Sequence, residues 1–194
     1  MLTTYYSCVK LTGSPVCGDK VTNMYETYSY CHKLTGSPVC GNKVIDMSGT
    51  YRNCRNLTGS PVCGPNVTSM YETYENCTNL TGSPVCGPKV VDMNRTYYNC
   101  YNLFGNMYIY SSNISSIARC FYGRNVSNIL NIYVQINSIS LTTLMNSATS
   151  TYSLTGNDCT WTNDIANNRY YNTRENIYIY PVENVISARE KNQD

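Results

Sequence analysis

The sequence predicts a repeat solenoid, mainly β with short helices or turns, made of stacked 23-residue coils with a C-terminal cap. The stretch Leu-Thr-Gly-Ser-Pro-Val-Cys-Gly occurs without substitution at intervals of 23 residues, beginning at Leu11, Leu34, Leu57 and Leu80. After Phe104 the strict repeat ends, and short alternating segments and an amphipathic tail follow. We therefore expect a repeat solenoid in residues 1–105, and degenerate repeats with a cap ending in a short helix in residues 106–194.

Equivalent positions of the repeat carry the same residue type, which predicts the core. Stacked coils would place equivalent side chains above one another, ~4.8 Å apart if neighbouring backbones pair as parallel strands. Pro15 and its equivalents lack an N–H group, which argues against a central strand at that point. The expected core positions are Leu11, Leu34, Leu57, Leu80 and Leu103; Val21, Val44, Val67 and Val90; Met24, Met47, Met70 and Met93; and Cys8, Cys31, Cys54, Cys77 and Cys100.

Nine of the 11 cysteines belong to two ladders of the repeat. Cysteine behaves as a small buried hydrophobe, and identical residues that point the same way rarely meet the torsion of a disulfide. We therefore expect reduced, buried thiols, with disulfides between rungs as the alternative. No Cys-x-x-Cys pair occurs and His32 is the only histidine, so we expect no metal site and no cofactor.

The repeats differ at a few polar and aromatic positions next to the methionine and around the first cysteine. On one side of a stack these positions would form a stripe, which we call the variable stripe, and repeat proteins build binding surfaces in this way. The alternative is drift at solvent-exposed positions. The candidate binding residues are Tyr25, Glu26, Tyr30, His32, Tyr71, Glu72, Tyr98 and Tyr101.

The repeat also resembles a known family. Its order is Cys-x-x-Leu, then Val-x-x-Met, then Tyr-x-x-Cys, as in Cys77–Leu80, Val90–Met93 and Tyr97–Cys100, and Asn66–Met70 reads Asn-Val-Thr-Ser-Met. This pattern resembles the BspA-like, treponemal-type leucine-rich repeats over about residues 1–105. The resemblance implies leucine-rich-repeat-like coils and a surface protein, bacterial or borne by a bacteriophage virion, that adheres to host or matrix partners. It implies no catalytic residues.

Beyond the repeats, three segments alternate β-branched or aromatic residues with others and are expected to be strands. They are Asn106–Tyr110, Asn131–Val134 and Asn176–Tyr180. A short helix is expected from Ser140. The tail is expected to form a capping helix that begins at Pro181 and turns Val182, Val185 and Ile186 to one face.

Composition and motifs exclude several classes of function. The net charge is +2 and only 13% of residues are charged, without a basic stripe, so we expect no nucleic-acid partner. No apolar run approaches the ~18 residues of a membrane span, so membrane insertion is not expected. The first residues lack the basic and apolar regions of a signal peptide. No nucleophile motif, phosphate loop or carboxylate pair is visible, so we expect a protein that is not an enzyme.

Two functions follow from this reading. The first is a surface or virion protein, located outside the cell, at the cell surface or on a virion, that binds a glycan or a protein through the variable stripe. The second is a structural protein that stacks end to end into oligomers or filaments. Met1 falls in the register of the ladder methionines, so the chain begins in mid-repeat and an open first coil would invite another chain. Met1, Leu2 and Val9 are the candidate assembly residues.

Overall fold

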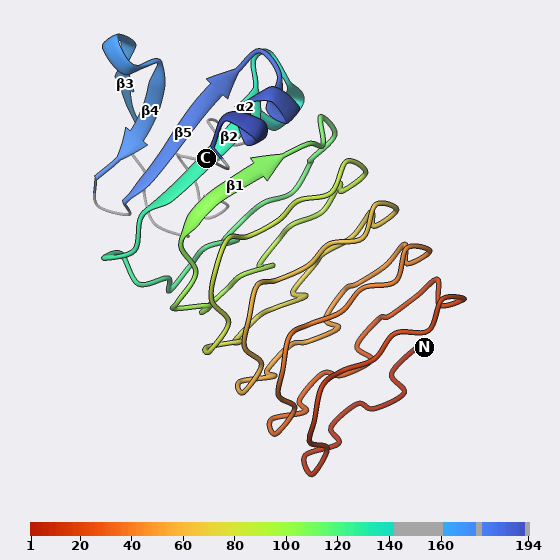
Figure 1. Cartoon of the computed structure of the whole chain (residues 1–194). Coiled ribbons are helices and arrows are strands. Elements are labelled where there is room, and N and C mark those ends of the chain that lie inside the picture. The colour runs from red at the N-terminus through yellow and green to blue at the C-terminus, as the bar shows by residue number, and fades with distance from the viewer. Residues whose placement is uncertain (142–160, 174–175, 193–194) are drawn as a thin grey trace.

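The computed structural model describes residues 1–141, 161–173 and 176–192. The strands in this part of the chain form one five-stranded mixed sheet in the order β1-β2-β5-β4-β3 (Figure 1). In this sheet β1 is parallel to β2 and β2 to β5, whereas β4 pairs antiparallel with both β5 and β3. The strands are β1 (Gly105–Ile109), β2 (Leu130–Gln135), β3 (Thr162–Asp164), β4 (Arg169–Asn172) and β5 (Ile177–Val182).

Two short helices accompany the C-terminal strands. A 3-10 helix, η2 (Ile165–Asn167), joins β3 to β4, and the α-helix α2 (Val185–Lys191) follows β5. The side chain of Asn184 caps α2 by accepting hydrogen bonds from the backbone N–H groups of Ile186 and Ser187. None of the described helices is long and apolar enough to cross a membrane.

The predicted fold class is wrong. The structure has a single open mixed sheet, neither closed nor curled, and not a mainly β solenoid of leucine-rich-repeat-like coils. Residues 1–104 consist of turns and isolated bridges, for example between Asp46 and Ser69. The division of the chain at residues 105 and 106 remains a prediction.

Backbone conformation explains why the repeats contain no strands. Three positions of each repeat have left-handed φ angles, as in one repeat 50° at Glu72, 60° at Asn76 and 81° at Gly82. Extended backbone requires negative φ, so these residues interrupt it at short intervals. The proline of each repeat removes a further N–H group from any ladder.

Backbone hydrogen bonds link neighbouring repeats, which lie side by side in Figure 1. Tyr28 donates its N–H to the carbonyl of Thr50, and Tyr51 donates to Thr73 in the same way, each at 2.9 Å. The threonine side chains add a second link, since the Thr73 hydroxyl donates to the carbonyl of Met47 at 2.9 Å. These polar groups are buried, so their hydrogen bonds offset the cost of removing them from water.

The core contains the leucine, valine, methionine and cysteine positions expected from the sequence, from the second repeat onward. In the first repeat Leu11 and Val21 are half-buried, and Cys8 is exposed. The sequence analysis missed a buried row of tyrosines, which are the largest fully buried side chains among the described residues. Their rings stack at centroid distances of 5.6 to 5.8 Å, and the residues are Tyr28, Tyr51, Tyr74 and Tyr97.

The ten cysteines that the structure describes are free thiols. In the first ladder the thiol of one repeat donates to a backbone carbonyl of the preceding repeat, as from Cys54 to Tyr28 at 2.9 Å and from Cys77 to Tyr51 at 3.0 Å. In the second ladder, burial raises the pKa of Cys40 to about 11 and that of Cys63 to about 12. A thiol reacts as the thiolate, so these cysteines should be inert in the folded chain.

We expect an alkylating reagent at pH 8 to modify Cys8 rapidly and to leave Cys54 and Cys77 unmodified until denaturant is added. Exposure favours the first reaction, and burial prevents the other two. Peptide mapping by mass spectrometry over time measures each site separately. Equal rates for Cys8 and Cys77 in the absence of denaturant would contradict the buried ladder.

The expected strands of the second half are confirmed as β1, β2 and β5. The helix expected at the C-terminal end is also present, but it begins at Val185 and not at Pro181. Pro181 belongs to β5, where it lies opposite Val134 of β2. The helix expected from Ser140 lies mostly outside the described residues.

Candidate ligand-binding site

The charged members of the variable stripe are held by ion pairs within the protein. Arg52 lies between two carboxylates, 2.5 Å from Glu26 and 2.8 Å from Glu72. Arg95 continues the chain of charges, 3.5 Å from Glu72 and 2.9 Å from Glu75. Desolvation, and then the neighbouring charge of Glu72, raises the pKa of Glu75. Glu72 is buried, so this network stabilises the face of the repeats and leaves little of Glu72 for a ligand.

Two tyrosines of the variable stripe also have internal partners. The guanidinium of Arg52 lies 5.3 Å from the ring centre of Tyr30, and that of Arg95 lies 4.6 Å from the ring centre of Tyr98. These distances are typical of cation–π contacts. The arginines therefore bind carboxylates and aromatic rings of the same face.

The rest of the variable stripe is more accessible. Tyr25, Tyr71 and Tyr101 are 41%, 38% and 45% exposed. The Nδ1 atom of His32 lies 2.9 Å from the carbonyl oxygen of Asn53. None of these residues lines the hollows described next, so a binding role for the variable stripe remains a prediction.

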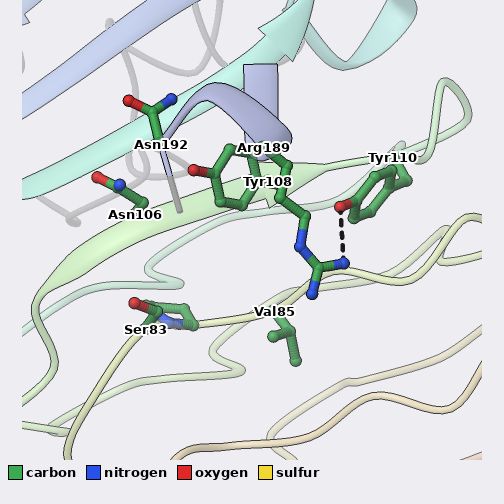
Figure 2. A pocket seen from close by; sticks show the side chains of 8 residues that line it. Ser83, Val85, Asn106, Tyr108, Tyr110, Arg189 and Asn192 are labelled. Atoms are coloured by element: carbon green, nitrogen blue, oxygen red, sulfur yellow. Dashed lines mark hydrogen bonds between the residues drawn. The ribbon is translucent and has the colours of Figure 1, made fainter. Parts of the chain in front are cut away.

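A separate hollow lies between β1, helix α2 and the Ser83–Val85 segment of the fourth repeat (Figure 2). It has a volume of about 310 Å³, and an adjoining hollow of about 380 Å³ continues over the preceding repeat. Val85, Tyr110 and Arg189 line both hollows. We call the two together the Tyr108 groove, after the tyrosine of β1 that lines the first.

The alternation of β1 places its polar side chains in this groove. Met107 and Ile109 are buried in the core, so Asn106 and Tyr108 point to the opposite face of the strand. Across the sheet the register aligns Tyr108 with Tyr133 and then with Tyr180. The three rings stack in this order, with centroids 5.1 and 5.0 Å apart.

The groove exists because the stack of rings on the sheet, formed by Tyr180, Tyr133 and Tyr108, ends at Tyr108. A parallel bridge between Cys86 and Ile109 aligns the fourth repeat with β1, so Val85 lies beside Tyr108 in the same row. Valine is much smaller than tyrosine, and Val85 leaves open the space that a further ring would fill. One face of the Tyr108 ring is covered by Tyr133, and the other side of the row is the groove.

Polar groups stand at the edges of the groove. The amide oxygen of Asn106 accepts a hydrogen bond from Asn131 at 3.0 Å, while the amide nitrogen of Asn106 has no partner among the described residues. Arg189 of α2 donates from Nη1 to the hydroxyl of Tyr110 at 3.1 Å, as the dashed line in Figure 2 shows. The groove thus combines an aromatic ring, an amide donor and a cation.

The sequence analysis did not identify this groove, although a signal for it was present. Residues 106–110 follow residues 83–87 by 23 positions, so Tyr108 continues the repeat position of Val85. That offset predicts both the neighbouring placement and the change from a small to a large side chain. The contribution of Arg189, more than 100 residues from Val85, has no comparable signal in the sequence.

Nothing in the described part of the chain indicates a metal centre. Among residues 1–141, 161–173 and 176–192 there is no group of three or more histidine, cysteine or acidic side chains placed to hold an ion. The resemblance to BspA-like repeats remains a prediction from the motif. No protein-family model, curated protein or solved structure matches this chain.

Proposed function

We propose that this protein is a non-catalytic recognition protein that binds a glycan in the Tyr108 groove. The observation that carries the proposal is the Tyr108 ring at the open end of a row of stacked rings. It lies beside a guanidinium and the Asn106 amide nitrogen, which has no partner among the described residues. The C–H face of a sugar ring packs on an aromatic ring, and its hydroxyls accept and donate hydrogen bonds. A site of this kind fixes its ligand with a few placed polar groups on an apolar floor.

The rigidity of the ring row supports binding. Tyr133 and Tyr180 stack behind Tyr108 on adjacent strands, so Tyr108 has little freedom to lose when a ligand arrives. A preorganised site avoids much of the entropic cost of association.

The size of the groove favours a glycan over a protein partner. Its two hollows have volumes of about 310 and 380 Å³. A stable protein interface buries more than ~1,000 Å² in total and has a broad apolar centre. A groove of this volume with polar edges suits a short segment of a saccharide chain better.

Glycan-array binding of the purified chain tests the proposal, with Val85→Tyr as the informative variant. This change would add a further ring beside Tyr108 and fill the groove. It should therefore abolish binding without lowering the melting temperature. Tyr71→Ala and Tyr101→Ala should leave binding intact because they lie outside the groove. If these two variants abolish binding and Val85→Tyr does not, the variable stripe is the site and the groove is not.

A second candidate function is self-assembly, and the first repeat supplies the observation that favours it. The carbonyls of Tyr25, Thr27 and Ser29 accept hydrogen bonds from the repeat before them, at 2.9, 2.8 and 2.8 Å. The equivalent carbonyls of Leu2 and Tyr6 have no partner among the described residues.

Exposed apolar side chains accompany this unpaired edge. Leu2 and Val9 are 62% and 50% exposed, whereas Met1 is half-buried against the core. Unpaired edges and apolar surface together favour association with another chain. We propose a second copy of this chain as the partner.

Light scattering over a dilution series tests self-assembly. The wild-type chain should form oligomers, and Leu2→Asp together with Val9→Asp should yield monomers. Oligomers that persist in the double variant, or a wild-type chain that is monomeric at all concentrations, would reject this function.

A further inference from the structure

We infer that the ligand of the Tyr108 groove is an anionic saccharide, whose carboxylate or sulfate group binds Arg189. This inference rests on the proposed glycan-binding function and adds the charge of the ligand to it. Three features of the groove support it: the isolation of Arg189 from carboxylates, its anchoring by Tyr110, and its position relative to Tyr108.

Among the described residues that line the groove, Arg189 is the only one with a charged side chain. Three other arginines of the described residues have carboxylate partners: Arg52 and Arg95 in the repeats, and Arg169 with Asp164 at 2.9 Å. Arg189 has no carboxylate within ion-pair distance among the described residues. A guanidinium at the edge of a polar groove, without a carboxylate partner among the described residues, is suited to an anion from outside.

The hydrogen bond to Tyr110 orients this guanidinium. It uses one N–H group of Nη1, at 3.1 Å, and leaves the other donors of the planar fork available. Two parallel donors of a guanidinium match the two oxygens of a carboxylate or of a sulfate. Because one end of the side chain is held, less rotamer freedom is lost when the anion binds.

The position of Arg189 also fits a sugar that rests on Tyr108. Figure 2 shows Arg189 extending from α2 across the hollow, with Tyr108 and Asn106 on the side of β1 and Val85 on the side of the repeat. A sugar ring in this space would face Tyr108, and its hydroxyls would lie near the amide nitrogen of Asn106. An acidic substituent on the ring would then lie toward Arg189.

Neither acidic residue in or beside α2 lines the groove. Glu183, which precedes α2, lines a different hollow. Glu190 follows Arg189 in the sequence but is not among the residues that line the groove. The groove therefore has a positive charge at its edge and no negative charge among its described lining residues.

The test is a titration of the purified chain by isothermal calorimetry with three oligosaccharide probes of similar length. These are hexagalacturonate, which carries carboxylates, dextran sulfate oligomers, which carry sulfates, and maltohexaose, which is neutral. The variant Arg189→Gln removes the charge and keeps a polar side chain. Lys191→Gln is the matched control, because it removes one positive charge from the same last turn of α2 outside the groove.

We expect the wild-type chain and Lys191→Gln to bind an anionic probe at least tenfold more tightly than the neutral one. Arg189→Gln should lose about tenfold or more of this affinity. Preference for hexagalacturonate would identify a carboxylate ligand, and preference for dextran sulfate would identify a sulfate.

Two results would overturn the inference, and they are distinguishable. If the neutral probe binds as tightly as the anionic ones, or Arg189→Gln binds like the wild type, the ligand is a neutral glycan and only the role of Arg189 is wrong. If the wild-type chain binds none of the three probes and no glycan of the array, the proposed function is wrong as well.

Discussion

Replacing Tyr74 with phenylalanine should lower the free energy of unfolding by about 1–3 kcal/mol. The ring of Tyr74 is fully buried, and its hydroxyl accepts from the N–H of Val62 at 3.0 Å and donates to the carbonyl of Val62 at 2.7 Å. Phenylalanine would preserve the stacking and leave both backbone groups without a partner. Tyr74→Ala removes the stack as well and should cost about 3–5 kcal/mol.

Urea unfolding followed by circular dichroism measures both changes. Tyr101→Phe is the control, because Tyr101 is 45% exposed and its hydroxyl makes no hydrogen bond with a described residue. It should change stability by less than about 0.5 kcal/mol. If Tyr74→Phe lowers stability as little as the control, the Tyr74 hydroxyl does not make the two hydrogen bonds with Val62.

Replacing Gly59 with alanine should destabilise the protein much more than the same change at Gly13. Both glycines have left-handed φ angles, 79° and 86°, so each variant carries the same backbone cost of about 1–2 kcal/mol. A Cβ at Gly59 would clash with Oγ of Ser37 and lie 3.2 Å from Cβ of Ser37, whereas a Cβ at Gly13 would meet nothing within 4 Å. The clash should add about 1–3 kcal/mol.

Thermal unfolding of the two variants gives the difference directly. Ser37→Ala removes the closest atom, so it should recover part of the loss in the Gly59→Ala background and show coupling in a double-mutant cycle. Equal destabilisation by Gly59→Ala and Gly13→Ala would mean that neighbouring repeats do not approach as closely as the structure shows.

The identity of the repeats predicted which residues are equivalent, and therefore most of the core. It did not predict the backbone conformation of the repeats, and so it did not predict the fold class. Left-handed φ angles occur at Glu26, Glu72 and Arg95, residue types that give little hint of that conformation, and only Gly49 at the same repeat position indicates it. Without this information, a 23-residue period predicts the wrong fold class.

The candidate site was also predictable from the sequence only in part. Alternation along residues 106–110 correctly predicted a strand, and with it the separation of Met107 from Tyr108 onto opposite faces. The ion pairs of Glu26 and Glu72 depend on Arg52, which comes from the repeat between them. Such ion pairs between repeats depend on how the repeats are aligned in three dimensions. The sequence alone therefore could not separate the accessible residues of the variable stripe from those held in internal ion pairs.

The measurement that most directly tests the central claim is an NMR titration of isotope-labelled protein with hexagalacturonate. Binding in the Tyr108 groove should shift the resonances of Asn106, Tyr108 and the Arg189 side chain, and leave those of Tyr25 and Tyr71 unchanged. Shifts confined to the variable stripe, or no shifts at any concentration of this probe or of maltohexaose, would contradict a glycan site in the groove.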